Sequence, residues 1–305
     1  MNIDTIYPPS LKPGDRIGVF APSSYVEKDD IEKSKALLEQ RGYEVFIHPQ
    51  TYERHNQSAG THLQKSLAFQ GLFMRDDINA IWAAGGGNRA LHLLETINFT
   101  KLKDRPKLLL GFSDITALLN ANYAHNKMVG IHTQVFKNLH KYEQLDHLLD
   151  MLAGQKTKIP FNDAKILHHG KATGHLIGGN LSIFQYLPQT LPGEFYDGAI
   201  LFLEECNEEL SKIDRMLLHL RRTGTLAKIS ALALGQFTDI TESGRPFGFA
   251  REDIVREHTE YLDIPVITDL PFGHTNNMHS LPIGTRATID TKKKILTLDE
   301  PAVRI

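Results

Sequence analysis

Short apolar runs alternate with helical patterns through the first half of the chain, and this alternation limits the fold more than any other feature. Runs typical of buried strands lie at residues 16–21, 44–47, 78–84 and 107–110. A helical stretch from Asp29 to Gln40 separates the first two runs, and Gly42 is the expected C-cap of that helix. Buried strands joined by helices predict a parallel α/β sheet.

The character of the sequence changes near residue 151. Residues 151–173 are polar and lack a regular pattern, which is typical of a linker. Beyond them, strand-like apolar runs mix with an amphipathic helix near residues 213–220, and the chain closes with a hairpin-like segment. We therefore expect an N-terminal α/β domain over residues 1–150, a linker over 151–173, and a smaller α+β domain over 174–305.

Composition removes several classes of function. The 34 basic and 36 acidic side chains leave a net charge of −2, which argues against a nucleic-acid or membrane-surface partner recruited by bulk charge. Cys206 is the single cysteine, so an intramolecular disulfide and a zinc site with several thiolates are excluded. No apolar run approaches the roughly 20 residues of a membrane span, and the N-terminal segment lacks the features of a secretory signal. We therefore expect a cytoplasmic protein.

Ser113 lies between a buried run and a helical pattern, in the local sequence Gly-Phe-Ser-Asp-Ile. A sharp turn from strand to helix would expose its hydroxyl at the sheet edge, beside the N–H groups of a helix N-terminus, which suits a nucleophile. Serine is also common as the N-cap of a helix, and position alone favours that role. The α/β-hydrolase fold is disfavoured because the second glycine of its Gly-x-Ser-x-Gly turn is missing.

Three glycines, Gly85, Gly86 and Gly87, follow the third apolar run and precede a helical pattern at residues 91–97. With Ala90 they satisfy the Gly-x-Gly-x-x-Ala fingerprint of dinucleotide-binding proteins. That fingerprint belongs in the first strand–helix unit, however, and no acidic residue lies clearly at the position expected after it. The same glycines could donate backbone N–H groups to an oxyanion, or simply supply backbone freedom. Spacing alone leaves these three interpretations open.

Acidic and histidine side chains add further candidates. Glu204 and Glu205 end an apolar run, where a carboxylate is either solvated or able to orient a histidine. His274 follows another buried run, but it is one of 15 histidines and carries little weight alone. His132 and the pair His168-His169 would suggest a metal, yet no His-Glu-x-x-His motif or other compact ligand set accompanies them, so we expect no metal.

Several short stretches, considered together, carry a resemblance to a known family. They are Gly14-Asp15-Arg16-Ile17, Ala21-Pro22-Ser23, Ser58-Ala59-Gly60-Thr61, Trp82-Ala83-Ala84 with the three glycines, Leu110 to Leu118, Gly178-Gly179-Asn180-Leu181, Leu203-Glu204-Glu205, Asp214-Arg215-Met216-Leu217 and Phe272-Gly273-His274. In this order and spacing they resemble the LD-carboxypeptidases of bacterial murein recycling, which are related to the self-immunity peptidases that inactivate microcin C. The resemblance covers nearly the whole chain.

The resemblance implies a catalytic triad made of Ser113, Glu204 and His274. It also implies a doubly wound, mainly parallel sheet in the N-terminal domain and a smaller mixed α+β C-terminal domain. In such a fold the triad is assembled where the two domains meet, with Ser113 on one side and the other two residues on the other. No cofactor or metal is implied.

The oxyanion site of the family corresponds here to the backbone N–H of Asp114 and that of Gly86 or Gly87. The family often has Arg-Gly-Gly-Tyr-Gly at this turn, whereas the arginine and the tyrosine are absent from this chain. Arg89 is a candidate, by proximity alone, for binding the carboxylate of the substrate.

The implied activity is that of a cytoplasmic serine carboxypeptidase, which hydrolyses an L,D-peptide bond and releases D-Ala from a murein tetrapeptide through an acyl-enzyme. An alternative is a self-immunity peptidase that cleaves a peptidyl-nucleotide antibiotic. A protein of a different class would bind a dinucleotide at residues 85–90. The expected partner is a small peptide, with no nucleic acid and no membrane, and a homodimer is one open option for its assembly.

Overall fold

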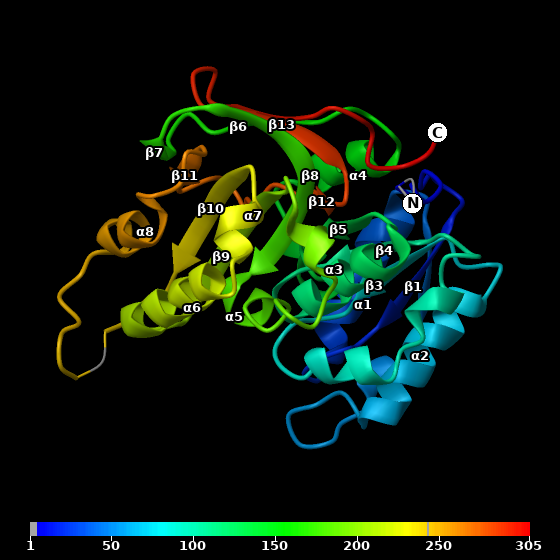
Figure 1. Cartoon of the computed structure of the whole chain (residues 1–305). Helices are drawn as coiled ribbons and strands as arrows, with labels where there is room; N and C mark the ends of the chain where they lie inside the picture. Colours follow the sequence, from blue (N-terminus) through cyan, green and yellow to red (C-terminus); the bar gives the residue numbers. More distant parts are fainter. Residues whose placement is uncertain (1–4, 243) are drawn as a thin grey trace. The chain divides into compact units, whose positions relative to one another are not determined.

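A computed structural model describes residues 5–242 and 244–305 of the chain (Figure 1). The first four residues of the N-terminal segment analysed above lie outside this description. The chain divides into two units, which are described separately. Unit 1 contains the described chain up to Lys156 together with His279–Thr285 and Pro301–Ile305, and unit 2 contains Thr157–Met278 and Arg286–Glu300.

Unit 1 is built on a six-stranded sheet with the strand order β12-β5-β4-β3-β1-β2. All neighbours are parallel except β12 and β5, which are antiparallel. The strands are β1 (Arg16–Phe20), β2 (Glu44–Ile47), β3 (Ala80–Ala83), β4 (Leu108–Gly111), β5 (Gly130–His132) and β12 (Leu281–Ile283). The helices are α1 (Lys28–Gln40), α2 (His62–Met74), α3 (Thr116–Asn126) and α4 (Leu145–Leu152), with 3-10 turns η1 (Pro49–Tyr52), η2 (Leu91–Glu95), η3 (Phe99–Lys101), η4 (Ser113–Ile115) and η5 (Phe136–Lys141).

The centre of this sheet explains where a ligand can bind. Strands β3 and β4 are buried at every position, as expected of parallel strands covered on both faces. From β1 the chain moves first to β2 on one side and then to β3 on the other, so the order of the sheet reverses between β1 and β3. In doubly wound sheets this switch point, at the carboxyl ends of the strands, is where ligands bind. The loops that follow β1 and β3 therefore border the expected site.

Unit 2 is built on an eight-stranded mixed sheet with the order β6-β14-β13-β8-β9-β10-β11-β7. Its four consecutive strands β8, β9, β10 and β11 are parallel, and the outer pairs are antiparallel. The strands are β6 (Lys158–Pro160), β7 (Lys165–His168), β8 (Lys171–Asn180), β9 (Ile200–Cys206), β10 (Ala231–Thr238), β11 (Val266–Thr268), β13 (Arg286–Asp290) and β14 (Ile295–Leu298). The helices are α5 (Leu181–Phe184), α6 (Leu210–Arg222), α7 (Thr225–Lys228) and α8 (Arg251–Thr259), with the 3-10 turn η6 (Gly193–Tyr196).

Two mixed α/β units with a mainly parallel first sheet are the predicted fold class, but the segment at 151–173 differs from the expectation. It is not a linker: it contains the end of α4, both β6 and β7, and the start of β8. Strands β6 and β7 are the two edges of the second sheet, where one side of each strand is unpaired, and this explains their polar sequence.

The C-terminal part of the chain also departs from the expected boundary at 174–305. Strand β12 pairs with β5 of unit 1, and residues 301–305 also belong to unit 1. No local pattern in the sequence indicates this pairing, because most of unit 2 lies between β5 and β12 along the chain. Among the described residues, no helix has both the length and the apolar character needed to cross a bilayer.

Candidate active site

Ser113 is held in an unusual backbone conformation where β4 turns into a helix. Strand β4 ends at Gly111, and Ser113 has a φ of 63° as the first residue of η4. The N-caps of η4 and α3 are Phe112 and Ile115, and neither helix has a side-chain cap, so the role favoured by position alone is not seen. A left-handed conformation costs a residue other than glycine about 1–3 kcal/mol and persists only where the surroundings enforce it. Such strain is common at functional turns.

The glycine turn after β3 packs directly on this serine. A Cβ added to Gly86 would lie 3.1 Å from the Cβ of Ser113 and 3.3 Å from its Oγ. Gly87 has a φ of 117°, and a Cβ there would lie 2.1 Å from the hydroxyl of Ser24. Ser24 in turn donates its backbone N–H to the carbonyl of Gly86, at 3.3 Å. Glycine is therefore required at position 87, and at position 86 its lack of a side chain lets the backbone of the turn approach the Ser113 side chain closely.

The region after the glycine turn differs from the expected helix at residues 91–97. The chain forms the five-residue 3-10 helix η2 (Leu91–Glu95) instead. A dinucleotide site needs an α-helix whose N-terminal N–H groups face the pyrophosphate. The glycine turn of this chain lacks that element, which removes the structural basis of the dinucleotide interpretation.

The side chain of Asp114 ties together the loops around Ser113. Its carboxylate is 1% exposed, and it accepts hydrogen bonds from the hydroxyl of Ser23, at 2.6 Å, and from the backbone N–H of Ala90, at 2.8 Å. Burial raises the pKa of Asp114, and the two hydrogen bonds act in the opposite direction. The carboxylate therefore links the loops that follow β1, β3 and β4, while its own backbone N–H is the expected oxyanion donor.

A buried lysine lies beneath these loops, and sequence reasoning missed it. Lys65, on α2, is fully buried and donates from Nζ to the hydroxyl of Ser58, at 3.0 Å. Burial lowers the pKa of Lys65 to about 8, although the nearby Asp114 carboxylate raises it. Lys65 lies four residues before Phe69 on the apolar face of α2, so a lysine at a core position was the available signal. Ser23 and Ser58 both lie in stretches that carry the family resemblance.

Unit 2 brings Glu204 and His274 together. Glu204, on β9, is fully buried, and its Oε2 accepts a hydrogen bond from Nδ1 of His274 at 2.6 Å. His274 follows β11 and comes directly after Gly273, whose φ of 130° and close approach to the backbone of Gln236 require glycine. In the neutral ring, this hydrogen bond places the proton on Nδ1, so Nε2 is the atom that takes up a second proton.

The neighbouring Glu205 has a structural role instead. Alternation along β9 sends its side chain to the opposite face of the strand. Its carboxylate accepts hydrogen bonds from Nδ2 of Asn180 and from the backbone N–H groups of Ser182 and Cys206, at 2.7–3.0 Å. Of the two acids expected at this strand end, only Glu204 orients a histidine.

The electrostatics of the Glu204–His274 pair favour the imidazolium. Burial of the ring lowers the pKa of His274, but the Glu204 carboxylate, helped by contact with Cys206 on the same face of β9, raises it to about 10. A buried carboxylate beside an imidazole stabilises the positive charge that develops when the ring takes up a proton. The pair is thus built to accept a proton.

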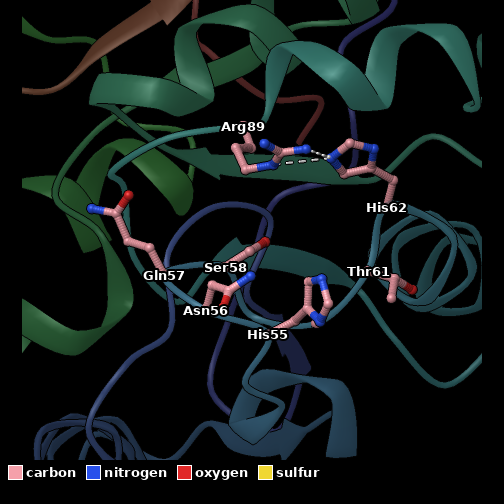
Figure 2. Close-up of a pocket in the computed structure, with 8 residues that line it drawn as sticks. His55, Asn56, Gln57, Ser58, Thr61, His62 and Arg89 are labelled. Carbon is pink, nitrogen blue, oxygen red and sulfur yellow. Dashed lines mark hydrogen bonds between the residues drawn. The ribbon is translucent and has the colours of Figure 1, made fainter.

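Arg89, the remaining candidate, lines a pocket of unit 1 shown in Figure 2 and bonds to His62. The candidates thus fall into two groups. Unit 1 contains Ser113, Asp114 and the glycine turn, and unit 2 contains Glu204 and His274. Over residues 5–242 and 244–305, no group of three or more His, Cys, Asp or Glu side chains is arranged to hold a metal ion.

Two sequence models of one family match the chain. The model described as the LD-carboxypeptidase N-terminal domain matches residues 17–133, which include Ser113 and the glycine turn. The model described as the LD-carboxypeptidase C-terminal domain matches residues 173–289, which include Glu204 and His274.

Comparison with individual proteins agrees with this match. A murein tetrapeptide carboxypeptidase of Pseudomonas aeruginosa is 29% identical over 289 residues, which cover 90% of this chain and 93% of that protein. The crystal structure of a muramoyltetrapeptide carboxypeptidase from Oxalobacter formigenes has a TM-score of 0.83 at 29% identity, over 94% of this chain and 99% of the other. MccF in complex with glutamyl sulfamoyl guanosine shares the fold, with a TM-score of 0.88 at 21% identity over 98% and 99% of the two chains. Because both domain models match and together span most of the chain, the protein belongs to the LD-carboxypeptidase family.

Proposed function

We propose that the protein is a serine carboxypeptidase that cleaves the bond between an L-centre and a terminal D-alanine in a murein tetrapeptide. The observation that carries the proposal is the 2.6 Å hydrogen bond between the buried Glu204 carboxylate and His274. An imidazole held and charged by a buried acid serves to move a proton to and from a nucleophile. We place the reaction in the cytoplasm, in the recycling of murein peptides, as the family resemblance implies.

In this proposal Ser113 is the nucleophile. Its Oγ attacks the carbonyl carbon of the scissile amide, while Nε2 of His274 takes the hydroxyl proton and then gives it to the departing amine of D-alanine. Water then attacks the acyl carbon and gives its proton to the same nitrogen; the bond to Oγ breaks, and the ring returns the proton to Oγ of Ser113 as the shortened peptide leaves. The proposal requires His274 to reach Ser113 in the working enzyme, and Glu204 to stabilise the imidazolium throughout.

The backbone N–H of Asp114 and that of Gly86 or Gly87 are the proposed oxyanion donors. The close packing of the glycine turn on Ser113 supports this role. One preorganised donor of this kind is typically worth about 2.7–4 kcal/mol of the activation barrier. No metal or organic cofactor takes part in the proposed reaction.

A direct assay tests the proposal. The purified protein is incubated with a murein tetrapeptide ending in D-alanine, with the same peptide ending in L-alanine, and with a peptidyl-nucleotide, and the released amines are separated. We expect rapid release of D-alanine alone, unaffected by a chelator. Preferential cleavage of the peptidyl-nucleotide would support the self-immunity alternative and overturn the murein substrate.

The nucleophile is tested with Ser113→Ala, with Ser230→Ala of unit 2 as the matched control. We expect Ser113→Ala to abolish turnover with an unchanged circular dichroism spectrum, and Ser230→Ala to retain activity. Activity that survives in Ser113→Ala would reject the assigned role.

A further inference from the structure

A pocket of about 350 Å³ opens on unit 1 beside the glycine turn. Its walls come from the loop at residues 55–61, the first residue of α2, His62, and Arg89. Figure 2 shows the guanidinium of Arg89 turned toward the ring of His62, with the loop at 55–58 beneath them in this view. The volume falls within the usual range for a small-molecule site.

Basic side chains line this pocket at His55, His62 and Arg89, among neutral residues. Arg89 donates from Nε and Nη2 to Nε2 of His62, at 3.1 and 2.8 Å, so this ring is neutral with its proton on Nδ1. The ring of His92 stacks on His62 with centroids 4.5 Å apart, and the buried Lys65 lies one turn along α2. Within the described residues, no carboxylate forms an ion pair with the Arg89 guanidinium.

The charges at this place repel one another. Burial lowers the pKa of His62, and so do its neighbours His92, Arg89 and Lys65, while only Glu95 raises it. Arg89 likewise lowers the pKa of Lys65. A pocket in which basic groups oppose one another's protonation gains stability when an anion enters it.

The pocket and the nucleophile share a continuous wall. Ser58, which lines the pocket, forms an isolated antiparallel bridge with Ser24. Ser24 packs against Gly87, and the adjacent Gly86 packs against Ser113. Arg89 lies only two residues beyond this turn. The wall of the pocket is therefore connected to Ser113 through the loop at Ser24 and the glycine turn.

Given the proposed carboxypeptidase activity, on which this inference rests, we propose that the pocket binds the terminal carboxylate of the peptide through Arg89 and His62. In an exopeptidase substrate only the amide nitrogen and one carbon separate this carboxylate from the scissile carbonyl, so its partner must lie near the oxyanion donors. Arginine binds a carboxylate with two parallel hydrogen bonds, which gives both strength and direction. Arg89 exchanges its bond to His62 for the carboxylate, and His62 takes up a proton.

The test uses N-acetyl-D-alanine and its carboxamide as probes, observed through the imidazole NMR signals of His62 in the Ser113→Ala protein. We expect the acid to bind at least about tenfold more tightly than the amide and to raise the pKa of His62, because the anion offsets the surrounding positive charge. Arg89→Gln should weaken binding of the acid by about tenfold or more and leave the amide unchanged, and Arg89→Lys should recover part of the loss. Arg41→Gln, an exposed arginine of unit 1 paired with Asp146, is the matched control and should have no effect.

Equal weakening of acid and amide in Arg89→Gln would overturn the inference, as would acid binding that leaves the His62 signals unmoved. In the active enzyme, the same substitution should raise KM for the tetrapeptide more than it lowers kcat. Failure of the proposed function is a separate result, because it appears as absence of hydrolysis by the wild-type protein. The comparison of acid with amide needs no turnover and decides about the pocket in either case.

Discussion

At the scale of single residues, the side chains proposed for chemistry are those held in unusual states. Ser113 has a left-handed backbone, and His274 has a pKa displaced far from that of a free histidine. The glycine turn packs against the Ser113 side chain, and a buried carboxylate stabilises the charged ring of His274. One substitution can remove each state: Ser113→Gly removes the backbone strain, and Glu204→Gln removes the negative charge beside His274.

The pH dependence of activity follows from the state of His274. Because the ring must be neutral to accept the Ser113 proton, kcat/KM should rise with pH through an inflection well above 6.5, the ordinary value. Glu204→Gln should shift this inflection to lower pH and reduce kcat by about 10⁴-fold. Steady-state rates measured from about pH 5 to about pH 10 give both the inflection and the change in kcat.

The neighbouring acid is the control for this profile. Glu205→Gln should reduce stability and leave the inflection in place, since that carboxylate bonds to backbone N–H groups and not to His274. An inflection that moves equally in both variants would contradict the assignment of Glu204.

Stability should follow the same titration. The folded-state pKa of His274 lies above the unfolded value, so the Glu204–His274 pair stabilises the folded protein fully below about pH 6.5. That contribution is lost as the pH rises toward about 10. Urea unfolding at several pH values should show the loss in the wild-type protein and its absence in His274→Ala.

The strain at Ser113 gives a second prediction. Ser113→Gly and Ser113→Ala both remove the hydroxyl, but only glycine adopts a φ of 63° without penalty. We expect the glycine variant to unfold with a free energy about 1 kcal/mol higher than the alanine variant, and both to be inactive. Chemical denaturation measures the difference, and a glycine variant less stable than the alanine variant would show that the turn is not strained.

At the level of residues, recognisable motifs supply the candidates, and the structure brings two of them, Glu204 and His274, together, whereas the contacts that support the candidates leave no pattern in the sequence. Ser113, Glu204 and His274 follow apolar strands and belong to motifs of the family. Ser58 and Lys65 interact only because α2 and the loop before it fold onto the strand ends. No spacing in the sequence encodes that contact, so it could not be predicted.

At the scale of elements, the glycine turn affects the site through its steric contact with Ser113. Gly86→Ala would place a methyl group 3.1 Å from the Cβ of Ser113, a tight contact that requires a shift of a few tenths of an ångström. We expect kcat/KM to fall by about 10² or more, because the serine or the oxyanion donor must move, while stability changes by about 1 kcal/mol or less. Steady-state kinetics and thermal unfolding distinguish the two effects.

Gly71 is the matched control for this substitution. It lies exposed within α2, and a Cβ there would meet nothing within 4 Å. Gly71→Ala should keep full activity and add about 0.5–1 kcal/mol of stability through helix propensity. Loss of activity in Gly71→Ala would show that the Gly86 effect does not arise from local crowding.

Elements with strong apolar periodicity were predicted well. Strands β1, β2 and β4 lie within about one residue of their expected bounds, and the apolar face of α6 is buried as its pattern indicates. The helix expected after the glycine turn is a 3-10 helix, and the expected linker holds two strands. In both places the local sequence is short and half-exposed, and tertiary pairing decides the outcome.

At the scale of the whole molecule, the sheet of unit 1 is completed by residues from far along the chain. Residues 301–305 also belong to this unit: Val303 is buried, and the backbone of Arg304 pairs with Pro8 and Ser10. Val303→Ala should lower the stability of unit 1 by about 1–3 kcal/mol. Hydrogen exchange should show faster opening of β1 and β5 with unchanged protection of β9 and β10.

Strand β12 and residues 301–305 have a further consequence for how the protein is made. The sheet that carries Ser113 cannot close until these late residues have left the ribosome, although most of that sheet is synthesised first. Most of unit 2 is synthesised between β5 and β12, so the edge of β5 stays unpaired during that interval. Newly made chains therefore carry an open edge on the nucleophile-bearing sheet until β12 has emerged, and this interval is the period in which a chaperone would matter most.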